Sequence, residues 1–324
     1  MVPALPNDFD PDAAAIGDGL FGLPNGPEDA RIRILPVEFQ ATCSYRLNTA
    51  DGPDAVLAAS HQVDLDSPWC GQAWKVGLHL DEPPAELQAV VKAARTASDA
   101  NEINHLSTAR TQLVTEWTRA RLAEQRVPAI LGGDHSCPLG AITAVNAERP
   151  ISILHVDAHH DLRPGYEGFP ESHASIMHNV LEAAGSVERI VQIGIRDLCG
   201  QERQRAADDP RIRTHYWSDW TRRMFGGESF ATLVGEALRE LTDAVWISFD
   251  IDGLDPTLCP GTGTPVPGGL SFDQTMYLLD ALRARSSQHD IVGFDLCEVG
   301  AGETDAIVGA RVLYELCGTM TLAT

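Results

Sequence analysis

Many apolar residues of this chain fall into short, mostly apolar runs, separated by longer stretches in which apolar and polar residues are mixed. Short runs of this kind are typical of buried strands, and they lie at 32–37, 127–131, 151–156, 190–195, 244–249 and 291–296. Between them, apolar residues recur three or four positions apart, as in Leu113, Trp117 and Ala120, which places one apolar stripe on a helix. Alternating helices and strands that are apolar nearly throughout predict a parallel sheet covered on both faces.

Residues 1–28 differ from this pattern because they are rich in Pro, Gly and Asp and show little apolar periodicity. We expect them to form an arm that lies on the surface or on a neighbouring subunit. No linker and no internal repeat divides the rest of the 324 residues. The sequence therefore predicts one α/β catalytic domain over residues 29–324.

Polar clusters directly follow three of the predicted strands, at the position where open α/β sheets bind their ligands. They read Gly-Gly-Asp-His-Ser at 132–136, Asp-Ala-His-His-Asp at 157–161 and Asp-Ile-Asp-Gly-Leu-Asp-Pro at 250–256. In an extended chain every second side chain points to the same side, so the last two clusters each present several donors together. The candidate metal ligands are His135, Asp157, His159, Asp161, Asp250 and Asp252.

These candidate ligands include four carboxylates. Gathered at a buried sheet edge, carboxylates repel one another and their pKa values rise unless cations neutralise them. Two divalent ions would supply the matching charge, and oxygen and imidazole donors without a thiolate favour Mn, Co or Ni over a structural zinc site. A metal pair lowers the pKa of a shared water toward neutrality. The sequence therefore predicts a catalytic dinuclear site and a hydrolysis reaction.

The charge balance and the cysteines restrict the partners and the compartment. The formal net charge is −22, from 24 Lys and Arg against 46 Asp and Glu, which disfavours nucleic acid and anionic lipid as partners and favours a small cationic substrate. The seven cysteines form no Cys-x-x-Cys pair, as is typical of proteins in a reducing cytoplasm. We find neither a secretory signal nor an apolar run of about 18 residues, so we expect a cytoplasmic protein that does not cross a membrane.

Taken together, the three polar motifs resemble those of the ureohydrolases, the family of arginases, agmatinases and guanidine hydrolases. The resemblance runs from about Ile34 to Leu316, and its most specific stretch is 248–269, where Ser-Phe-Asp-Ile-Asp-Gly-Leu-Asp-Pro is followed by Pro-Gly-Thr-Gly-Thr-Pro at 260–265. It implies the three-layer α/β/α sandwich of the arginase fold, with a mostly parallel sheet. It also implies a homo-oligomer, either a trimer or a hexamer.

The resemblance further implies that each subunit holds two divalent metal ions, either Mn²⁺ or Ni²⁺. The first ion would take His135, Asp157, Asp161 and Asp250, and the second would take Asp157, His159, Asp250 and Asp252. Asp157 and Asp250 would therefore bridge the two ions.

Three residues match catalytic positions of the family. Glu298, just past the run at 291–296, matches the glutamate that orients the substrate, since a guanidinium cation must be held close to metals that repel it. His173 matches the histidine that protonates the leaving amine. Asp161 would hydrogen-bond the activated water in addition to binding metal. We expect His160 and Tyr166 to line the pocket and His155 to face the core.

Departures from the family pattern narrow the substrate. Glu298-Val299 continues into Gly-Ala-Gly where many members have Val-Asn-Pro, and 172–175 reads Ser-His-Ala-Ser instead of Ser-His-Gly-Thr. These loops resemble the agmatinase-like subgroup close to guanidine hydrolases. The expected substrate is therefore guanidine, agmatine, or a substituted guanidine or biguanide, rather than arginine. Two alternatives stay open: a noncatalytic partner subunit of a mixed ureohydrolase assembly, and a dinuclear phosphoesterase, although basic residues are sparse beside the motifs.

Overall fold

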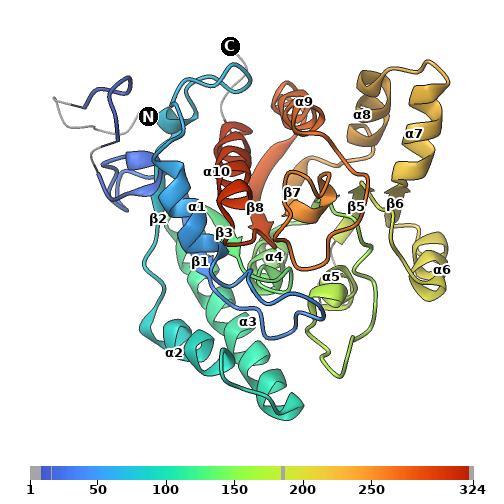
Figure 1. The fold of residues 1–324 in the computed structure, drawn as a ribbon, viewed down its shortest axis with the longest axis horizontal. Coiled ribbons are helices and arrows are strands. Elements are labelled where there is room, and N and C mark those ends of the chain that lie inside the picture. Colours follow the sequence, from blue (N-terminus) through green and yellow to red (C-terminus); the bar gives the residue numbers. More distant parts are fainter. Residues whose placement is uncertain (1–8, 16, 184–186, 321–324) are drawn as a thin grey trace.

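A single sheet of parallel strands runs through the computed structural model, which describes residues 9–15, 17–183 and 187–320 (Figure 1). Within these residues the sheet has eight strands in the order β2-β1-β3-β8-β7-β4-β5-β6, and every neighbouring pair is parallel. The strands are β1 (Ile32–Val37), β2 (Leu78–Leu80), β3 (Val127–Gly132), β4 (Ile151–Val156), β5 (Val187–Ile193), β6 (Ile212–His215), β7 (Ala244–Asp250) and β8 (Asp290–Cys297). All six strands expected from the sequence are present, together with the short edge strands β2 and β6.

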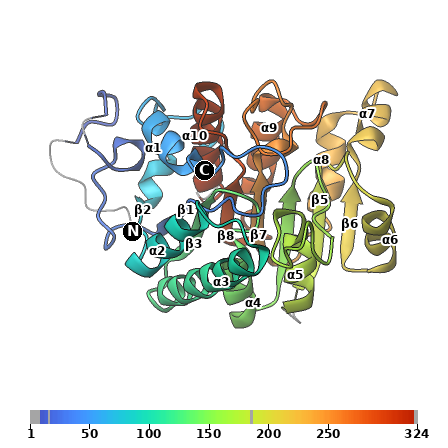
Figure 2. The same cartoon turned by 60° about the horizontal axis from the view of Figure 1, so that its bottom comes forward.

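Helices cover both faces of the sheet and form the outer layers of a three-layer α/β/α sandwich (Figure 2). One face carries α1 (Gly52–Ser60), α7 (Trp217–Phe225), α8 (Phe230–Leu238), α9 (Phe272–Arg283) and α10 (Glu303–Gly318). The opposite face carries α2 (Ala85–Ala94), α3 (Ala100–Ala123), α4 (Leu139–Glu148) and α5 (Ile176–Ala183). Helix α6 (Gly200–Asp208) lies beside the edge strand β6.

The side chains on the two faces of each central strand belong to two separate hydrophobic cores. In β4, Ile151 and Ile153 pack with α2–α5, whereas Leu154 and Val156 pack with the helices of the other face. This arrangement explains why the run at 151–156 is mostly apolar: a strand buried on both faces has no solvent-facing positions. The rigid centre of the sheet fixes where the carboxyl ends of its strands lie.

The segment predicted as an N-terminal arm packs in part on its own chain. Leu20, Phe21 and Leu23 are buried in the core beside α1 and α10, and the Phe21 ring lies 5.0 Å from the ring of Tyr314. Residues 1–8 and 16 of the segment lie outside the described residues. The boundary at residue 28 stays a prediction, but the part around Leu20 lies within the body of the molecule.

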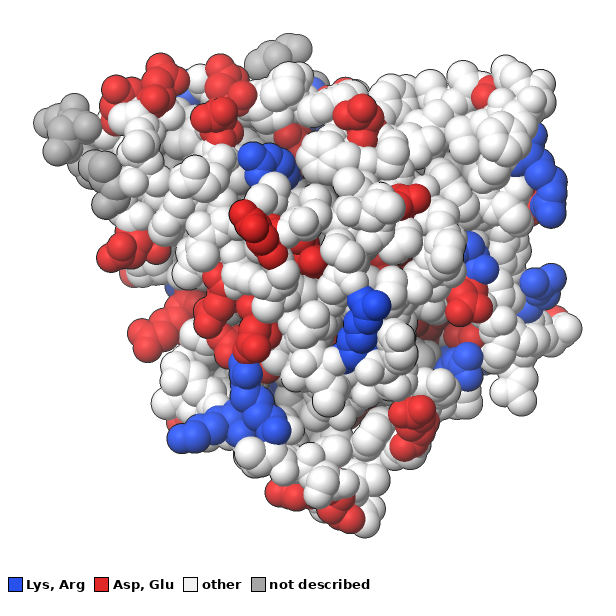
Figure 3. Space-filling model, viewed as in Figure 1, with Lys and Arg blue, Asp and Glu red and all other residues white. Residues whose placement is uncertain are grey.

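The surface reflects the acidic composition. Figure 3 shows acidic side chains spread over one face, with basic side chains in small separate groups between them. Among the described residues, no helix has both the length and the apolar character needed to cross a membrane.

Candidate active site

The predicted ligands follow three of the four adjacent strands β3-β8-β7-β4 at the centre of the sheet. His135 follows β3, Asp157, His159 and Asp161 follow β4, and Asp250 ends β7 with Asp252 in the turn behind it. Because parallel strands end at the same edge of the sheet, residues more than a hundred positions apart in the sequence meet there.

A first group of donors surrounds Nδ1 of His135. This nitrogen lies 3.0 Å from Asp157 Oδ2, 3.2 Å from Asp161 Oδ2 and 3.3 Å from Asp250 Oδ2. All four side chains are buried. One imidazole nitrogen and three carboxylate oxygens that converge in this way can hold one metal ion.

A second group lies around Nδ1 of His159, which is 3.1 Å from Asp252 Oδ2 and 3.4 Å from Asp157 Oδ1. Asp157 therefore belongs to both groups: Oδ2 faces His135 and Oδ1 faces His159. The structure thus brings all six predicted ligands together, with Asp157 between the two groups.

The charges of these acids favour bound cations at the site. Burial raises the pKa of the Asp250 carboxyl well above its usual range, and the charges of Asp252 and Asp157 raise it further. Burial also raises the pKa of Asp161, again with help from Asp157. The pKa of Asp157 itself lies well below its usual value, because His155 and the hydrogen-bonded histidines outweigh the effect of burial. Divalent cations would relieve this repulsion, and oxygen and imidazole donors fit Mn²⁺ or Ni²⁺.

Glu298 lies at the end of β8, next to the first group of donors. Its Oε1 accepts a hydrogen bond of 3.0 Å from the backbone N–H of His135. Its Oε2 is buried and has no hydrogen-bond partner among the described residues. Burial and the charge of Asp134 raise the pKa of Glu298 well above the usual range of a glutamate. A buried carboxylate oxygen without a donor is suited to a cationic ligand.

Asp161 and Glu298 both adopt backbone conformations that non-glycine residues rarely adopt. Their φ angles are 54° and 62°, in the left-handed region. Such conformations cost about 1–3 kcal/mol each and concentrate at functional sites. Here one lies in the loop after β4 and the other at the end of β8, and both place a carboxylate beside the candidate ligand His135.

His173 begins a short 3-10 helix, η3 (His173–Ser175), on the loop that leads into α5. Its backbone N–H donates to Thr42 Oγ1 at 3.0 Å, and its ring nitrogens lie 3.4 Å from Ser44 Oγ and 3.3 Å from Ser172 Oγ. Thr42 Oγ1 in turn donates to the buried carboxylate of Asp134 at 2.8 Å. The loop at 42–44 therefore fixes both the backbone and the ring of His173.

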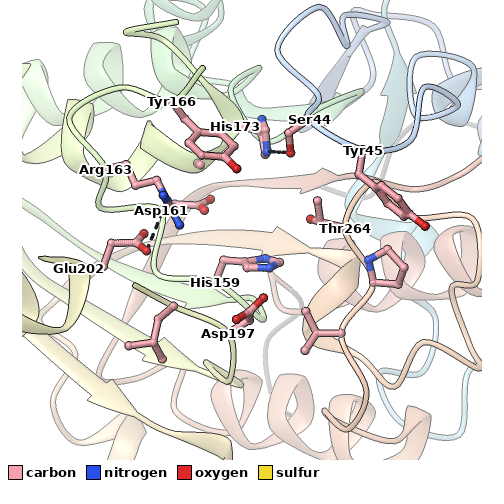
Figure 4. A pocket seen from close by; sticks show the side chains of 14 residues that line it. Ser44, Tyr45, His159, Asp161, Arg163, Tyr166, His173, Asp197, Glu202 and Thr264 are labelled. Atoms are coloured by element: carbon pink, nitrogen blue, oxygen red, sulfur yellow. Dashed lines mark hydrogen bonds and ion pairs between the residues drawn. The ribbon is translucent and has the colours of Figure 1, made fainter. Parts of the chain in front are cut away.

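His159, Asp161 and His173 surround one cavity of about 300 Å³ (Figure 4). Tyr166 also lines this cavity, as expected, with its ring edge-on to His173 at 6.0 Å. A cavity of this size suits a small organic molecule.

Sequence reasoning missed several residues at the site. Arg163 lies 4.6 Å from the centre of the Tyr166 ring and pairs with the buried Glu202 at 3.5 Å, and the exposed Asp197 lines the cavity mouth. His160 does not line this cavity but is buried against Gln192. His155 is buried as expected, yet its ring reaches Asp157 at 2.9 Å. The sequence did carry a signal for this contact: His155 and Asp157 are two positions apart, so their side chains point to the same side of an extended chain.

Comparison with known proteins identifies the family. The Arginase family matches residues 30–318. This chain belongs to the arginase family. It is 31% identical to the N(1)-aminopropylagmatine ureohydrolase of Thermus thermophilus over 92% of this chain and 94% of the relative. It is 32% identical to the enzyme of the same name from Thermococcus kodakarensis, over 91% and 92% of the two chains.

Solved structures of the family share the fold. The agmatine ureohydrolase of Thermoplasma volcanium superimposes with a TM-score of 0.71 at 23% identity, covering 97% of this chain and 95% of that one. The proclavaminate amidino hydrolase of Streptomyces clavuligerus gives 0.70 at 22% identity, covering 99% and 97%. The predicted agmatinase-like ureohydrolase membership and the α/β/α fold are confirmed. As a family member, this chain is a hydrolase of C–N bonds in linear amidines, which leaves the phosphoesterase alternative without support.

Proposed function

We propose that this chain is a dinuclear-metal amidinohydrolase. It cleaves the guanidino C–N bond of a small guanidinium compound and releases urea or a related product and an amine. The observation that carries the proposal is the position of Asp157, whose two oxygens face two separate sets of metal-binding donors.

Two divalent ions, Mn²⁺ or Ni²⁺, fit the two donor sets. The first would be held by His135, Asp157, Asp161 and Asp250, and the second by Asp157, His159, Asp250 and Asp252. When bound, such ions supply the Lewis acidity that makes water a nucleophile near neutral pH.

The protein's own groups perform the remaining steps. Glu298 binds the guanidinium through Oε2, which has no donor within the described protein. This contact holds the reacting carbon against the repulsion of the metal ions and orients it for attack. Asp161 accepts a hydrogen bond from the attacking water. His173 donates a proton from a ring nitrogen to the departing amine, because an amine leaves far more readily when it is protonated.

The cavity favours a small substrate with a planar cationic head. The names of the relatives point to agmatine and aminopropylagmatine, and free guanidine, guanidino acids and biguanides are further members of the same chemical class. Tyr166 offers an aromatic edge beside His173. We also propose that the protein acts in the cytoplasm as a homo-oligomer, a trimer or hexamer, with a mixed assembly containing a homologous subunit as the alternative.

The test is to load the metal-stripped protein separately with Mn²⁺ and Ni²⁺ and to measure urea and ammonia release across a panel of guanidines. We expect turnover of at least one guanidine, and its loss in Asp157→Ala with the fold intact by circular dichroism. Glu298→Gln should reduce kcat/KM while metal content stays at the wild-type level. Protein that binds two ions but turns over no guanidine alone, and gains activity on mixing with a homologous subunit, would instead support the mixed assembly.

A further inference from the structure

The buried histidine His155 contacts the metal site but has no role in the reaction described above. Its side chain is inaccessible to solvent, and its Nε2 lies 2.9 Å from Asp157 Oδ2. Its other ring nitrogen, Nδ1, lies 3.0 Å from Nε2 of Gln192 on β5. His155 therefore links the central carboxylate of the site to a neighbouring strand.

The surroundings of Gln192 fix the direction of these hydrogen bonds. Its Nε2 lies 2.9 Å from the backbone carbonyl oxygen of His160, which can only accept. Its Oε1 lies 3.0 Å from the hydroxyl of Thr214, which donates. The amide nitrogen must therefore point toward His155, so Nδ1 of His155 accepts a hydrogen bond and Nε2 carries the proton that is donated to Asp157.

The same direction continues away from the metal site. Oε1 of Gln192 accepts from Nδ1 of His160 at 2.7 Å, which leaves Nε2 of His160 to accept from the hydroxyl of Tyr216 at 3.2 Å. His155, Gln192 and His160 are all completely buried. We call this row of four residues, Tyr216–His160–Gln192–His155, the aligned chain. All its donors point toward Asp157, and aligned hydrogen bonds strengthen one another in a low-dielectric interior.

The aligned chain and a second hydrogen-bond donor together hold the carboxylate of Asp157 in one orientation. The backbone N–H of His159 donates to Oδ1 at 2.5 Å, while His155 donates to Oδ2. Each carboxylate oxygen has about two acceptor positions, so one position on each oxygen is left for a metal ion. The carboxylate plane is thus set before any ion binds. Because the Gln192 amide carries no titratable proton, the chain orients groups rather than conducting protons.

We infer that His155 is a positioning residue for the metal site: the aligned chain holds it as the Nε2–H tautomer, and its hydrogen bond orients Asp157 to bridge two ions. The inference rests on the dinuclear site of the proposed function. Hydrogen bonds to metal-binding groups of this kind typically change metal affinity by about 10–100-fold.

The test measures Mn²⁺ affinity by calorimetry on the full-length, metal-stripped protein. His155→Met removes the donor at similar volume, and we expect a loss of affinity of about 10–100-fold. His155→Gln keeps an N–H near the position of Nε2 and should retain most of the affinity. His289→Met is the matched control: His289 is also buried, with Nδ1 hydrogen-bonded to the Thr242 carbonyl at 2.8 Å, but it precedes β8 at the opposite edge of the sheet.

A double-mutant cycle tests whether Gln192 acts through His155. Gln192→Met should weaken Mn²⁺ binding, and the double variant with His155→Met should bind no more weakly than His155→Met alone. Fully additive losses would show that Gln192 does not act through His155 and would overturn the aligned chain. The positioning role of His155 would be overturned if His155→Met bound Mn²⁺ within twofold of the wild type, or if His155→Gln lost as much affinity as His155→Met. Wild-type protein that binds no metal would overturn the proposed function as well, so the two failures are distinguishable.

Discussion

Gly263 lies against the carboxylate of Glu298. A methyl group added at Gly263 would displace this carboxylate and so tests whether activity depends on its exact position. A Cβ on Gly263 would stand 2.5 Å from Glu298 Oε2, whereas ordinary contact begins near 3.4 Å, so one partner must move by about 0.9 Å. The backbone around Gly263 is restrained, because the Gly261 N–H donates to Asp305 at 2.7 Å and the Val266 carbonyl accepts from Arg196 at 2.8 Å. We therefore expect the end of the Glu298 side chain to move.

The structure predicts a small cost in stability and a large cost in activity for Gly263→Ala. The displaced carboxylate loses its hydrogen bond from the His135 N–H, worth about 0.5–1.5 kcal/mol. A misplacement of about 1 Å at a reacting group lowers the rate about 100-fold, which corresponds to about 2.7 kcal/mol in the activation barrier. Activity should thus fall far more than stability.

The assay compares kcat/KM on the best guanidine substrate, metal content and the free energy of unfolding for Gly263→Ala and for the control Gly26→Ala. Gly26 has no atom within 4 Å of an added Cβ, so its variant should match the wild type in all three measurements. A Gly263→Ala enzyme with kcat/KM within threefold of the wild type would refute the role given to Glu298. Loss of metal from the variant would show that the carboxylate acts on the ligands instead.

Three further outcomes follow from the structure. His173→Asn should lower kcat by about 100- to 10,000-fold while metal content is unchanged, and a normal rate would exclude His173 as the proton donor. Asp81→Ala should lower the free energy of unfolding by about 3–5 kcal/mol in chemical denaturation, because the buried Asp81 pairs with Arg33 at 2.6 Å; activity per folded molecule should not change. Burial lowers the pKa of His135, but hydrogen bonds to its carboxylate partners raise this pKa well above the ordinary histidine value of about 6.5. The pKa of His159 is raised in the same way. Metal binding must displace these protons, so Mn²⁺ affinity should rise with pH above about 6.5 with proton release in calorimetry, and a flat profile would contradict the assignment.

The central part of the fold could be predicted because its signal is local. Strands buried on both faces are mostly apolar, so β3, β4 and β7 stand out in the sequence, and the polar residues after them mark one edge of the sheet. The edge strands β2 and β6 were missed because Leu78–Leu80 and Ile212–His215 are short and partly exposed, and so lack this signal.

The meeting of the candidate ligands at one edge of the sheet was predictable for the same reason, whereas the residues hydrogen-bonded to them were not. Asp157 and His159 belong to one short motif, but the partner of His155 is Gln192, on another strand. A buried glutamine in an apolar run carries no mark of its direction or its partner. Which hydrogen bonds it makes depends on how β4 and β5 align, and that register is a property of the folded sheet.

The central claim is that Asp157 joins two metal ions, and anomalous diffraction from crystals of the Mn²⁺-loaded protein tests it most directly. The account predicts two manganese peaks per chain, one beside Nδ1 of His135 and one beside Nδ1 of His159, with Asp157 contacting both. A single peak, no peak, or peaks away from these two histidines would contradict it.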